Sequence, residues 1–566
     1  MALHLFIACA KAAGALLIAR GVVWLANLFL VAPRSDPLRN LPGPEASALQ
    51  SHFGTVDDPD ITPVLYHEWT RLFGKTFRYH GYGSHDYRVF STDLRVISHV
   101  LNSPIYEKPW QTRSYLERLL GQGVFGMEGA EHKVLRKLIG PAFTAQAVKE
   151  MSPAFFQKAE ELRDRWDALI SAQSGTIDVA HWLSRTTFDI FGLAGLDYHF
   201  NALHDESEPV YSAYRQMFAI SDKASQSRVL KQLYLPILEK IWPDADDKNT
   251  QRCQKIIRES GLSLIKSKRD AILAEKPDFS SGERDILSLL IKSNLSSEPS
   301  NRLSDTQLLD QITSFLFAGS DSTSLAITWC LHLLSLHPDI QNRLRAEIIS
   351  GPPTSPRSSK RDSLSSVSST SSTTSQVQVD TIDSLPYLDA VVRETLRVMP
   401  PVHGTVRVAT ADDLIPISHP VVLRSGKTIH ANEHIRIRKG SVVHIPLEGI
   451  NMAEEIWGAA AEAREFNPDR WTSLLASAKL PTLGVANVMS FSFGGHSCPG
   501  ARFALIEAKV ILATLLAHFV FSPVEGIEIG KFNSVLTRPF VRGKLQEDGI
   551  QLPLRVDHYV ESHDDA

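Results

Sequence analysis

A cysteine near the C-terminus, Cys498, lies in a glycine-rich loop that reads FSFGGHSCPG over residues 491–500. Gly494 and Gly495 carry no Cβ, so the backbone of this loop can approach a flat ligand closely. The run ARFALIEAKVILATLLAHF predicts a helix directly after the loop, and amide groups at a helix start favour a thiolate over a thiol. A thiolate is one of the few protein groups that can ligate haem iron. The alternative is a buried free thiol at the start of a core helix.

The loop resembles the haem-binding signature of the cytochrome P450 family, Phe-x-x-Gly-x-Arg-x-Cys-x-Gly. The matching residues are Phe491, Gly494, Cys498 and Gly500, while His496 stands where the family usually has arginine. The resemblance implies that Cys498 is the axial ligand of haem b (iron protoporphyrin IX). It also implies a mainly α fold with small β-sheets, of the α+β class, in which a triangular helical haem domain follows an N-terminal transmembrane helix.

A second polar motif, AGSDST at residues 318–323, lies inside a long helix predicted over residues 304–336. Ser304 has the side chain of an N-cap, and Pro338 is placed to open the next helix. The motif is similar to the oxygen-activation motif of the P450 family, Ala/Gly-Gly-x-Asp/Glu-Thr-Thr.

The resemblance gives the residues of this motif separate roles. It implies that small Ala318 and Gly319 leave room for dioxygen, and that Asp321 and the hydroxyl after it relay protons to the oxygen. Ser322 stands where the family generally has threonine, with Thr323 next to it, so the hydroxyl is kept without the methyl that restricts its rotation. The alternative is a polar helix interior, in which these hydroxyls bond to the carbonyl four residues back.

A charged set resembles the Glu-Arg-Arg triad of the P450 family. Glu394 and Arg397 lie three residues apart in RETLR, and therefore on one helix face, and EFNPDRW at residues 465–471 supplies Arg470. In isolation the first two would be an ordinary surface ion pair. The resemblance implies a buried structural network that supports the cysteine loop.

Haem carries two propionates, which need cationic or donor partners. In EHKVLRKLIGPAF, His132 occupies the position of a family tryptophan, and Arg136 follows one turn later. Arg407 matches the family's arginine after the Glu-x-x-Arg helix, and His496 replaces a further arginine. The two histidines predict propionate binding that is weaker and more dependent on pH, because histidine titrates near neutrality.

Composition excludes some classes of protein. The chain has 566 residues, of which 43% are apolar, and its net charge of −4 gives no basic footprint for nucleic acid. Only four cysteines occur, without CxxC spacing, which argues for a reducing compartment and against a structural zinc site.

The first 32 residues predict a membrane anchor. Between Leu3 and Ala32 the only charges are Lys11 and Arg20, and about 20 apolar helical residues span a bilayer. Arg20 is unfavourable near the bilayer centre, although snorkelling reduces that cost. A cleaved signal peptide or an interfacial helix is the alternative.

Residues 33–44 predict a proline-rich hinge that cannot continue the helix, with the haem domain over residues 45–566. Arg34 and Arg39 favour a cytosolic catalytic domain by the positive-inside rule. The expected location is therefore the endoplasmic reticulum membrane, with a single N-terminal span.

Helical periodicity dominates after about residue 60, with β-like pieces at Thr76–Tyr82, Tyr87–Ser91 and Ile435–Ile445. Residues 350–381 begin with a run rich in serine and threonine that cannot bury enough apolar surface to offset its ordering entropy. They predict a disordered surface insert. This segment is either a tolerated insertion or a loop that can be phosphorylated.

The resemblance implies a monooxygenase that inserts one oxygen atom from O2 into a lipophilic small molecule. Electrons would come from NADPH through a membrane-bound cytochrome P450 reductase, with cytochrome b5 as a further donor, and Lys133 and Lys137 would meet an acidic patch of that partner. Similarity to basidiomycete members suggests secondary metabolism with terpenoid-, steroid- or polyketide-like substrates. Substrate contacts are expected from the segment Tyr106–Phe125, from Phe315 and Ala318 on the long helix, from Val402 and Thr405, and from Val535–Thr537.

Two other classes stay open. A haem-thiolate isomerase or dehydratase uses no dioxygen and often lacks the acid and alcohol that Asp321 and Ser322 supply here. A non-catalytic haem- or sterol-binding membrane protein would bind a ligand without forming product. Dependence on NADPH separates the first of these from a monooxygenase.

Overall fold

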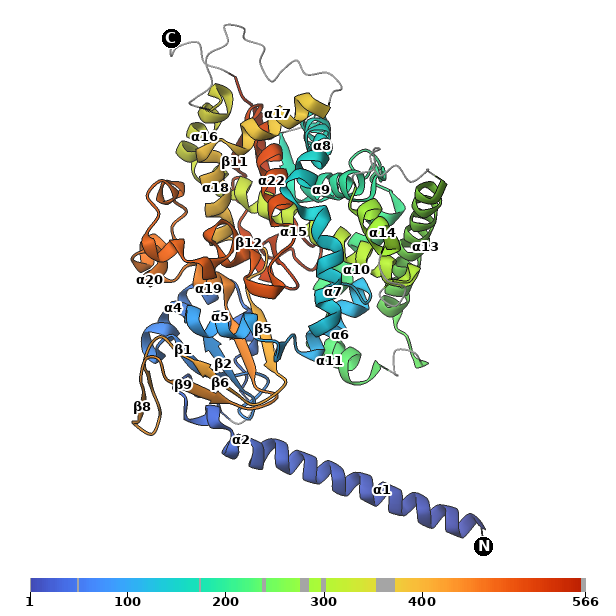
Figure 1. Cartoon of the computed structure of the whole chain (residues 1–566), viewed down its shortest axis with the longest axis vertical. Coiled ribbons are helices and arrows are strands. Elements are labelled where there is room, and N and C mark those ends of the chain that lie inside the picture. Colours follow the sequence, from blue (N-terminus) through green and yellow to red (C-terminus); the bar gives the residue numbers. More distant parts are fainter. Residues whose placement is uncertain are drawn as a thin grey trace. The chain divides into compact units, whose positions relative to one another are not determined.

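The computed structural model describes residues 2–47, 50–172, 175–236, 241–274, 285–296, 302–352 and 372–560. Its chain forms two compact units (Figure 1). The first unit comprises Met1–Pro109 and Gly404–Ala453, and the second comprises Trp110–His403 and Glu454–Ala566. Strands dominate the main body of the first unit, and helices dominate the second. The predicted class, mainly α with small β-sheets, is confirmed.

The N-terminal segment is helical beyond the predicted anchor. It consists of α1 (Ala2–Ala26), the π-helical η1 (Asn27–Val31) and α2 (Ala32–Ser35). The stretch Gly14–Ser35 is long and apolar enough to cross a membrane, by length and composition. The hinge predicted over residues 33–44 was wrong for residues 33–35, because Pro33 occupies the first turn of α2, where its missing N–H is not needed.

The first unit is built on a five-stranded sheet. Its strands follow the order β1 (Thr76–His80), β2 (Tyr87–Ser91), β10 (Val442–Ile445), β5 (Thr405–Ala409) and β3 (Tyr106–Glu107). Only the pairing of β2 with β10 is parallel. The piece predicted at 435–445 is two strands, since β9 (His434–Ile437) pairs separately with β6 (Asp413–Pro416).

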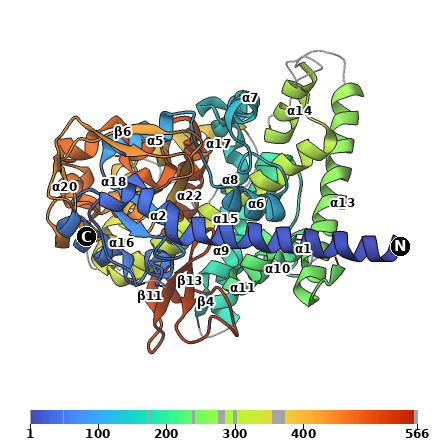
Figure 2. The same cartoon turned by 90° about the horizontal axis from the view of Figure 1, so that it is seen from below.

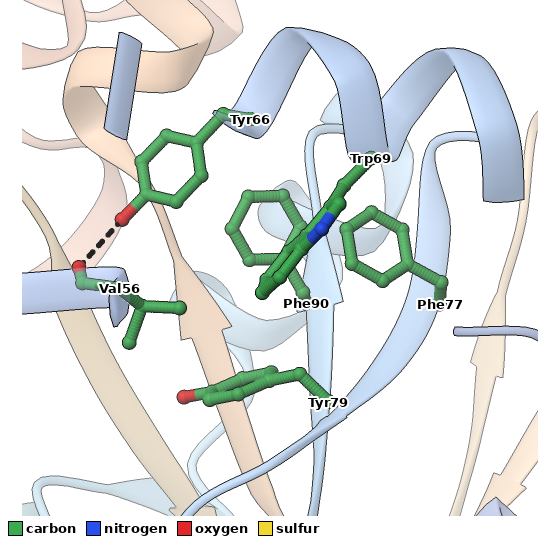
Figure 3. Packing of buried hydrophobic residues seen from close by; sticks show 6 residues of the cluster. All are labelled: Val56, Tyr66, Trp69, Phe77, Tyr79 and Phe90. Carbon is green, nitrogen blue, oxygen red and sulfur yellow. Dashed lines mark hydrogen bonds between the residues drawn. The ribbon is translucent and has the colours of Figure 1, made fainter. Parts of the chain in front are cut away.

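An aromatic cluster forms the core of this unit (Figure 3). The rings of Phe77 on β1 and Phe90 on β2 stack with their centroids 4.7 Å apart. Tyr66, on α4 (Thr62–Phe73), donates its hydroxyl to the carbonyl of Val56 at 2.8 Å. The ring is therefore buried while its polar end is satisfied.

The second unit is a helical assembly (Figure 1, Figure 2). Its longer helices are α8 (Ala145–Ala172), α9 (Val179–Leu196), α10 (Pro209–Asp222), α13 (Ala245–Ala274), α15 (Asp305–Leu336), α16 (Pro338–Ser350), α18 (Pro386–Val398) and α22 (Ala501–Leu516). Shorter elements include α6 (Trp110–Leu120), α7 (Gly129–Ile139), α11 (Gln226–Tyr234) and α14 (Ile286–Ser296). Small sheets are formed by β4 (Thr176–Asp178), β11 (Phe519–Pro523) and β14 (Pro553–His558), and by β12 (Ile529–Asn533) with β13 (Thr537–Val541).

The central helix α15 confirms the helix predicted over 304–336. Ser304 and Gln307 form a capping box, in which each side chain accepts from the other residue's backbone N–H. Pro338 opens α16, as predicted. Because α15 packs against α9, α13 and α22, most of its residues are buried.

The predicted disordered insert ends earlier than expected. Ser372–Asp383 form α17, which packs against α8 and α22, so the prediction was wrong for residues 372–381. Val379 and Ile382 are buried there, and the Lys509 ammonium on α22 lies 2.7 Å from the Asp383 carboxylate. Residues 353–371 lie outside the described residues.

Candidate active site

Short 3₁₀ turns carry the chain into the cysteine loop of the second unit. They are η10 (Met489–Phe491) and η11 (Gly494–His496). The backbone N–H of Cys498 donates to the carbonyl of Phe491 at 2.8 Å, which closes the loop. Gly494 has a φ of 73°, a conformation that favours glycine. The loop geometry therefore requires glycine at the position that the signature specifies.

Cys498 is solvent-accessible, although protein atoms crowd around its thiol. Burial raises the pKa of this thiol, while the Gly500 amide and the Arg136 guanidinium oppose that rise. The protein alone therefore does not favour the thiolate, contrary to the sequence-based expectation. A bound metal ion deprotonates a coordinating thiol directly.

Basic side chains lie near Cys498 and its loop. Arg136 on α7 is close enough to Cys498 for the thiolate to raise the pKa of the guanidinium, which burial lowers. One turn earlier, His132 stacks on His496, with ring centroids 4.1 Å apart. His496 Nε2 lies 3.2 Å from a carboxylate oxygen of Glu128.

These groups fit the cofactor that the sequence implies. Within a single unit, a guanidinium lies near an accessible thiol, and two stacked imidazoles come from the same helix and the same loop. Haem needs an axial ligand together with partners for two carboxylates. The structure thus brings together His132, Arg136, His496 and Cys498, with Phe491, Gly494 and Gly500 in the loop.

Arg407 belongs to the first unit. It lies on β5 with a side chain that is 4% exposed, and its Nη1 donates to the Thr405 hydroxyl at 2.6 Å and to the Val406 carbonyl at 2.9 Å. Its expected role toward the propionates stays a prediction.

The predicted triad is assembled at Glu394. Arg397 Nε and Nη2 each donate to a different Glu394 oxygen at 2.8 Å, and Arg470 Nε donates to Glu394 Oε1 at 2.8 Å. Glu394 and Arg397 are fully buried. Two further donors complete the shell of Glu394: the backbone N–H of Asn467 at 2.9 Å and the indole of Trp471 at 3.0 Å.

The small residues of α15 differ in their exposure and in their neighbours. Ala318 and Ser322 are partly exposed and lie four residues apart on one face. The Ser322 hydroxyl donates to the Ala318 carbonyl at 2.6 Å, as the polar-interior alternative expected. Gly319 points toward α9 instead, where an added Cβ would lie 2.2 Å from the ring of Phe191. Gly319 therefore serves helix packing.

Asp321 lies beside Arg538, and Thr323 lies beside Glu507. No local pattern in the sequence indicated either partner. Asp321 is buried, and its Oδ2 accepts a hydrogen bond from Arg538 Nη2 at 2.6 Å. Thr323 lies beside the fully buried carboxyl of Glu507 on α22, and burial raises the pKa of that carboxyl well above its usual range. Only the fold brings these residues together, since Asp321 and Arg538 are 217 positions apart.

Known proteins match this chain along nearly its whole length. The family model for cytochrome P450 matches residues 42–544. Cytochrome P450 monooxygenase 128 of Postia placenta is 36% identical, over 97% of this chain and 98% of its own length. Cytochrome P450 monooxygenase claP of Ampulloclitocybe clavipes is 32% identical, over 92% of this chain and 93% of its own. A ganoderic acid synthetase of Ganoderma lucidum is 30% identical, over 87% and 89%.

Among solved structures, a cytochrome P450 matches with a TM-score of 0.66 and 24% identity, over 91% of this chain and 100% of its own. That likeness supports the fold. The protein belongs to the cytochrome P450 family, whose members bind haem.

Proposed function

We propose that this protein is a haem-thiolate monooxygenase that inserts one oxygen atom from O2 into a lipophilic small molecule. Electrons come from NADPH through a cytochrome P450 reductase, with cytochrome b5 as a second donor. The relatives named above as monooxygenases and as a ganoderic acid synthetase support a substrate of fungal secondary metabolism, similar to a terpenoid, steroid or polyketide.

One observation carries this proposal: an accessible cysteine in the signature loop, with Arg136 beside its thiol. In the proposal, Cys498 ligates the iron of haem b. His132, Arg136 and His496 hold the propionates, together with Arg407. Haem bound at Cys498 would activate dioxygen.

The remaining roles fall to α15 and to the triad. Ala318 and Ser322 lie on a partly exposed face of α15, and we assign proton transfer to Asp321, Ser322 and Thr323. Glu394, Arg397 and Arg470 stabilise the segment that precedes the cysteine loop.

Aromatic side chains pack between α10, α15 and the segment that precedes α7. The rings of Phe218 on α10 and Phe317 on α15 stack with centroids 4.8 Å apart, and Phe125 meets Phe317 edge-on at 6.1 Å. These aromatic side chains thus connect α15 both with α10 and with the segment that precedes α7.

The apolar N-terminal helix supports a membrane anchor in the endoplasmic reticulum, with the catalytic part on the cytosolic side. Lys133 and Lys137 are exposed on α7, the helix that also carries His132 and Arg136. In the proposal, an acidic surface of the reductase docks there.

Reduced carbon monoxide difference spectra of the full chain test the haem ligand. The native protein is expected to give the thiolate-shifted Soret band, and Cys498→Ser is expected to lose it. A Cys498→Ser protein that keeps the band would contradict the assignment.

Co-expression with a fungal reductase in yeast tests the reaction. Terpenoids, steroids and aromatics are fed, and products are compared between the native protein and Cys498→Ser. Products that need NADPH and Cys498 support a monooxygenase. Product formation without NADPH would point to an isomerase or dehydratase.

A further inference from the structure

Arg538, on β13, is a buried cation between two carboxylates. Its side chain is 0% exposed. Nη2 donates to Asp321 Oδ2 on α15 at 2.6 Å, and Nε lies 3.1 Å from Asp222 Oδ2 at the end of α10. One guanidinium therefore connects a helix, a hairpin strand and a second helix, all within the second unit.

The strand that carries Arg538 is itself fixed in place. The indole N–H of Trp329 on α15 donates to the carbonyl of Thr537 at 3.1 Å, and the Thr537 amide donates to the carbonyl of Pro401 at 2.8 Å. β12 pairs with β13 along its length. Because both bonds hold the residue next to Arg538, the guanidinium enters the interior from a rigid support.

Asp321 is the main partner of Arg538. Burial raises the pKa of Asp222, whereas Arg538 and Arg215 hold the pKa of Asp321 below its usual range despite complete burial. Arg215 Nη1 on α10 lies 3.6 Å from Asp321 Oδ1. Two phenols also face this cluster: the fully buried Tyr214 on α10, and Tyr115 on α6, which lies near Asp222 and Arg538.

We infer that Arg538 is a positioning residue for the reaction, which fixes the Asp321 carboxylate on α15 and connects it to the end of α10 through Asp222. This inference rests on the proposed function, because it deepens the role given to Asp321. A planar guanidinium can serve two carboxylates at once, which an ammonium does less well. The position of α10 and the orientation of Asp321 are thereby coupled through one side chain.

The first test measures the coupling without any turnover. Thermal unfolding of the haem-loaded full chain is followed for Arg538→Gln, Asp321→Asn, Asp222→Asn and the two double variants that contain Arg538→Gln. Arg538 contacts both carboxylates, so the effects on Tm are expected to be clearly non-additive in both pairs. Additive effects in the Arg538 and Asp321 pair would overturn the inference.

The second test measures the reaction. Arg538→Gln is expected to lower product formed per NADPH several-fold and to raise peroxide release, while the substrate-induced spin shift keeps its midpoint. Without its main cation, Asp321 gains a higher pKa, so the limb of the kcat profile that depends on Asp321 moves to higher pH. Arg538→Lys is expected to restore part of both effects, because it keeps the charge.

Arg542→Gln is the matched control. Arg542 follows in the same hairpin but is 40% exposed and pairs with Glu528, so its loss is expected to leave product yield and the pH profile unchanged. An Arg538→Gln profile that matches the native one would overturn the inference. If Arg538→Gln does not fold, Arg538→Lys and Asp222→Asn test the inference instead. A native product yield and a native pH profile in both variants would contradict the coupling.

The carbon monoxide spectrum separates this inference from the proposed function. Absence of the thiolate-shifted Soret band from the spectrum of the native protein would contradict the haem assignment itself. A normal band with additive unfolding effects would overturn only the role of Arg538.

Discussion

The imidazole rings of His132 and His496 stack with their centroids 4.1 Å apart and 20° between their planes. His132 comes from α7 and is buried, and His496 comes from the cysteine loop. The stack therefore ties the loop that carries Cys498 to the helix that carries Arg136. Both histidines stand where the family pattern has other residues, and they replace those residues with a mutual contact.

Replacing His496 by alanine is expected to lower the haem content of the purified protein at least several-fold. The change removes both the ring stack and the contact with Glu128 at 3.2 Å. His496→Arg is expected to keep full haem content, because a guanidinium can pair with Glu128 and with a propionate. The measurement is the ratio of Soret to protein absorbance. His434→Ala, at an exposed position on β9, is the control, and an unchanged ratio in His496→Ala would exclude the proposed role.

Replacing Glu394 by glutamine is expected to destabilise the protein by about 3–5 kcal/mol, because it leaves the buried guanidinium of Arg397 without its counter-charge. Haem content is expected to fall with stability, since the triad supports the segment before the loop. Chemical denaturation of the purified protein measures the change. Glu259→Gln removes one partner of an exposed pair with Lys255, and about 0.5 kcal/mol or less is expected there. Equal effects in the two variants would contradict a buried network.

The sequence predicted those features that depend on local patterns. The N-cap at Ser304, the proline that opens α16 and the Glu394–Arg397 pair are set by residues close together in the chain. The loop around Cys498 was also predicted, because its glycines serve a local backbone geometry. Features of this kind need no knowledge of the fold.

Long-range contacts account for what the sequence did not reveal. Gly319 was expected to make room for dioxygen, yet its missing Cβ accommodates Phe191 of another helix. Arg538 reaches Asp321 across 217 positions. The end of the serine-rich insert was misjudged because Val379 and Ile382 find an apolar surface only in the folded protein.

Replacing Gly319 by alanine is expected to cost about 1–3 kcal/mol through overpacking. The new methyl carbon would lie 2.2 Å from the Phe191 ring, and Phe191 is 2% exposed and has little freedom to move. The free energy of unfolding measures the effect. Gly54→Ala is the control, because nothing lies within 4 Å of an added Cβ there. A neutral Gly319→Ala would show that α9 and α15 can separate without loss.

Replacing Glu507 by glutamine is expected to stabilise the protein, and increasingly so as the pH rises above about 4.5. Burial raises the pKa of this carboxyl well above its usual range, so the folded state keeps a proton that the unfolded state releases. The native state then binds more protons than the unfolded state, and stability falls with rising pH by up to about 1.4 kcal/mol per unit, until the pH passes the folded pKa. Glutamine has the same shape and removes this slope.

Thermal unfolding of the native protein and of Glu507→Gln across pH 5 to about 8 measures that difference. Glu525→Gln, at an exposed position in the turn after β11, is the control and is expected to follow the native curve. If the Tm difference between Glu507→Gln and the native protein stayed constant over this range, Glu507 would have to be ionised in the folded state. Its buried position on α22 next to Thr323 would then require a cation or a bound water chain that neutralises it.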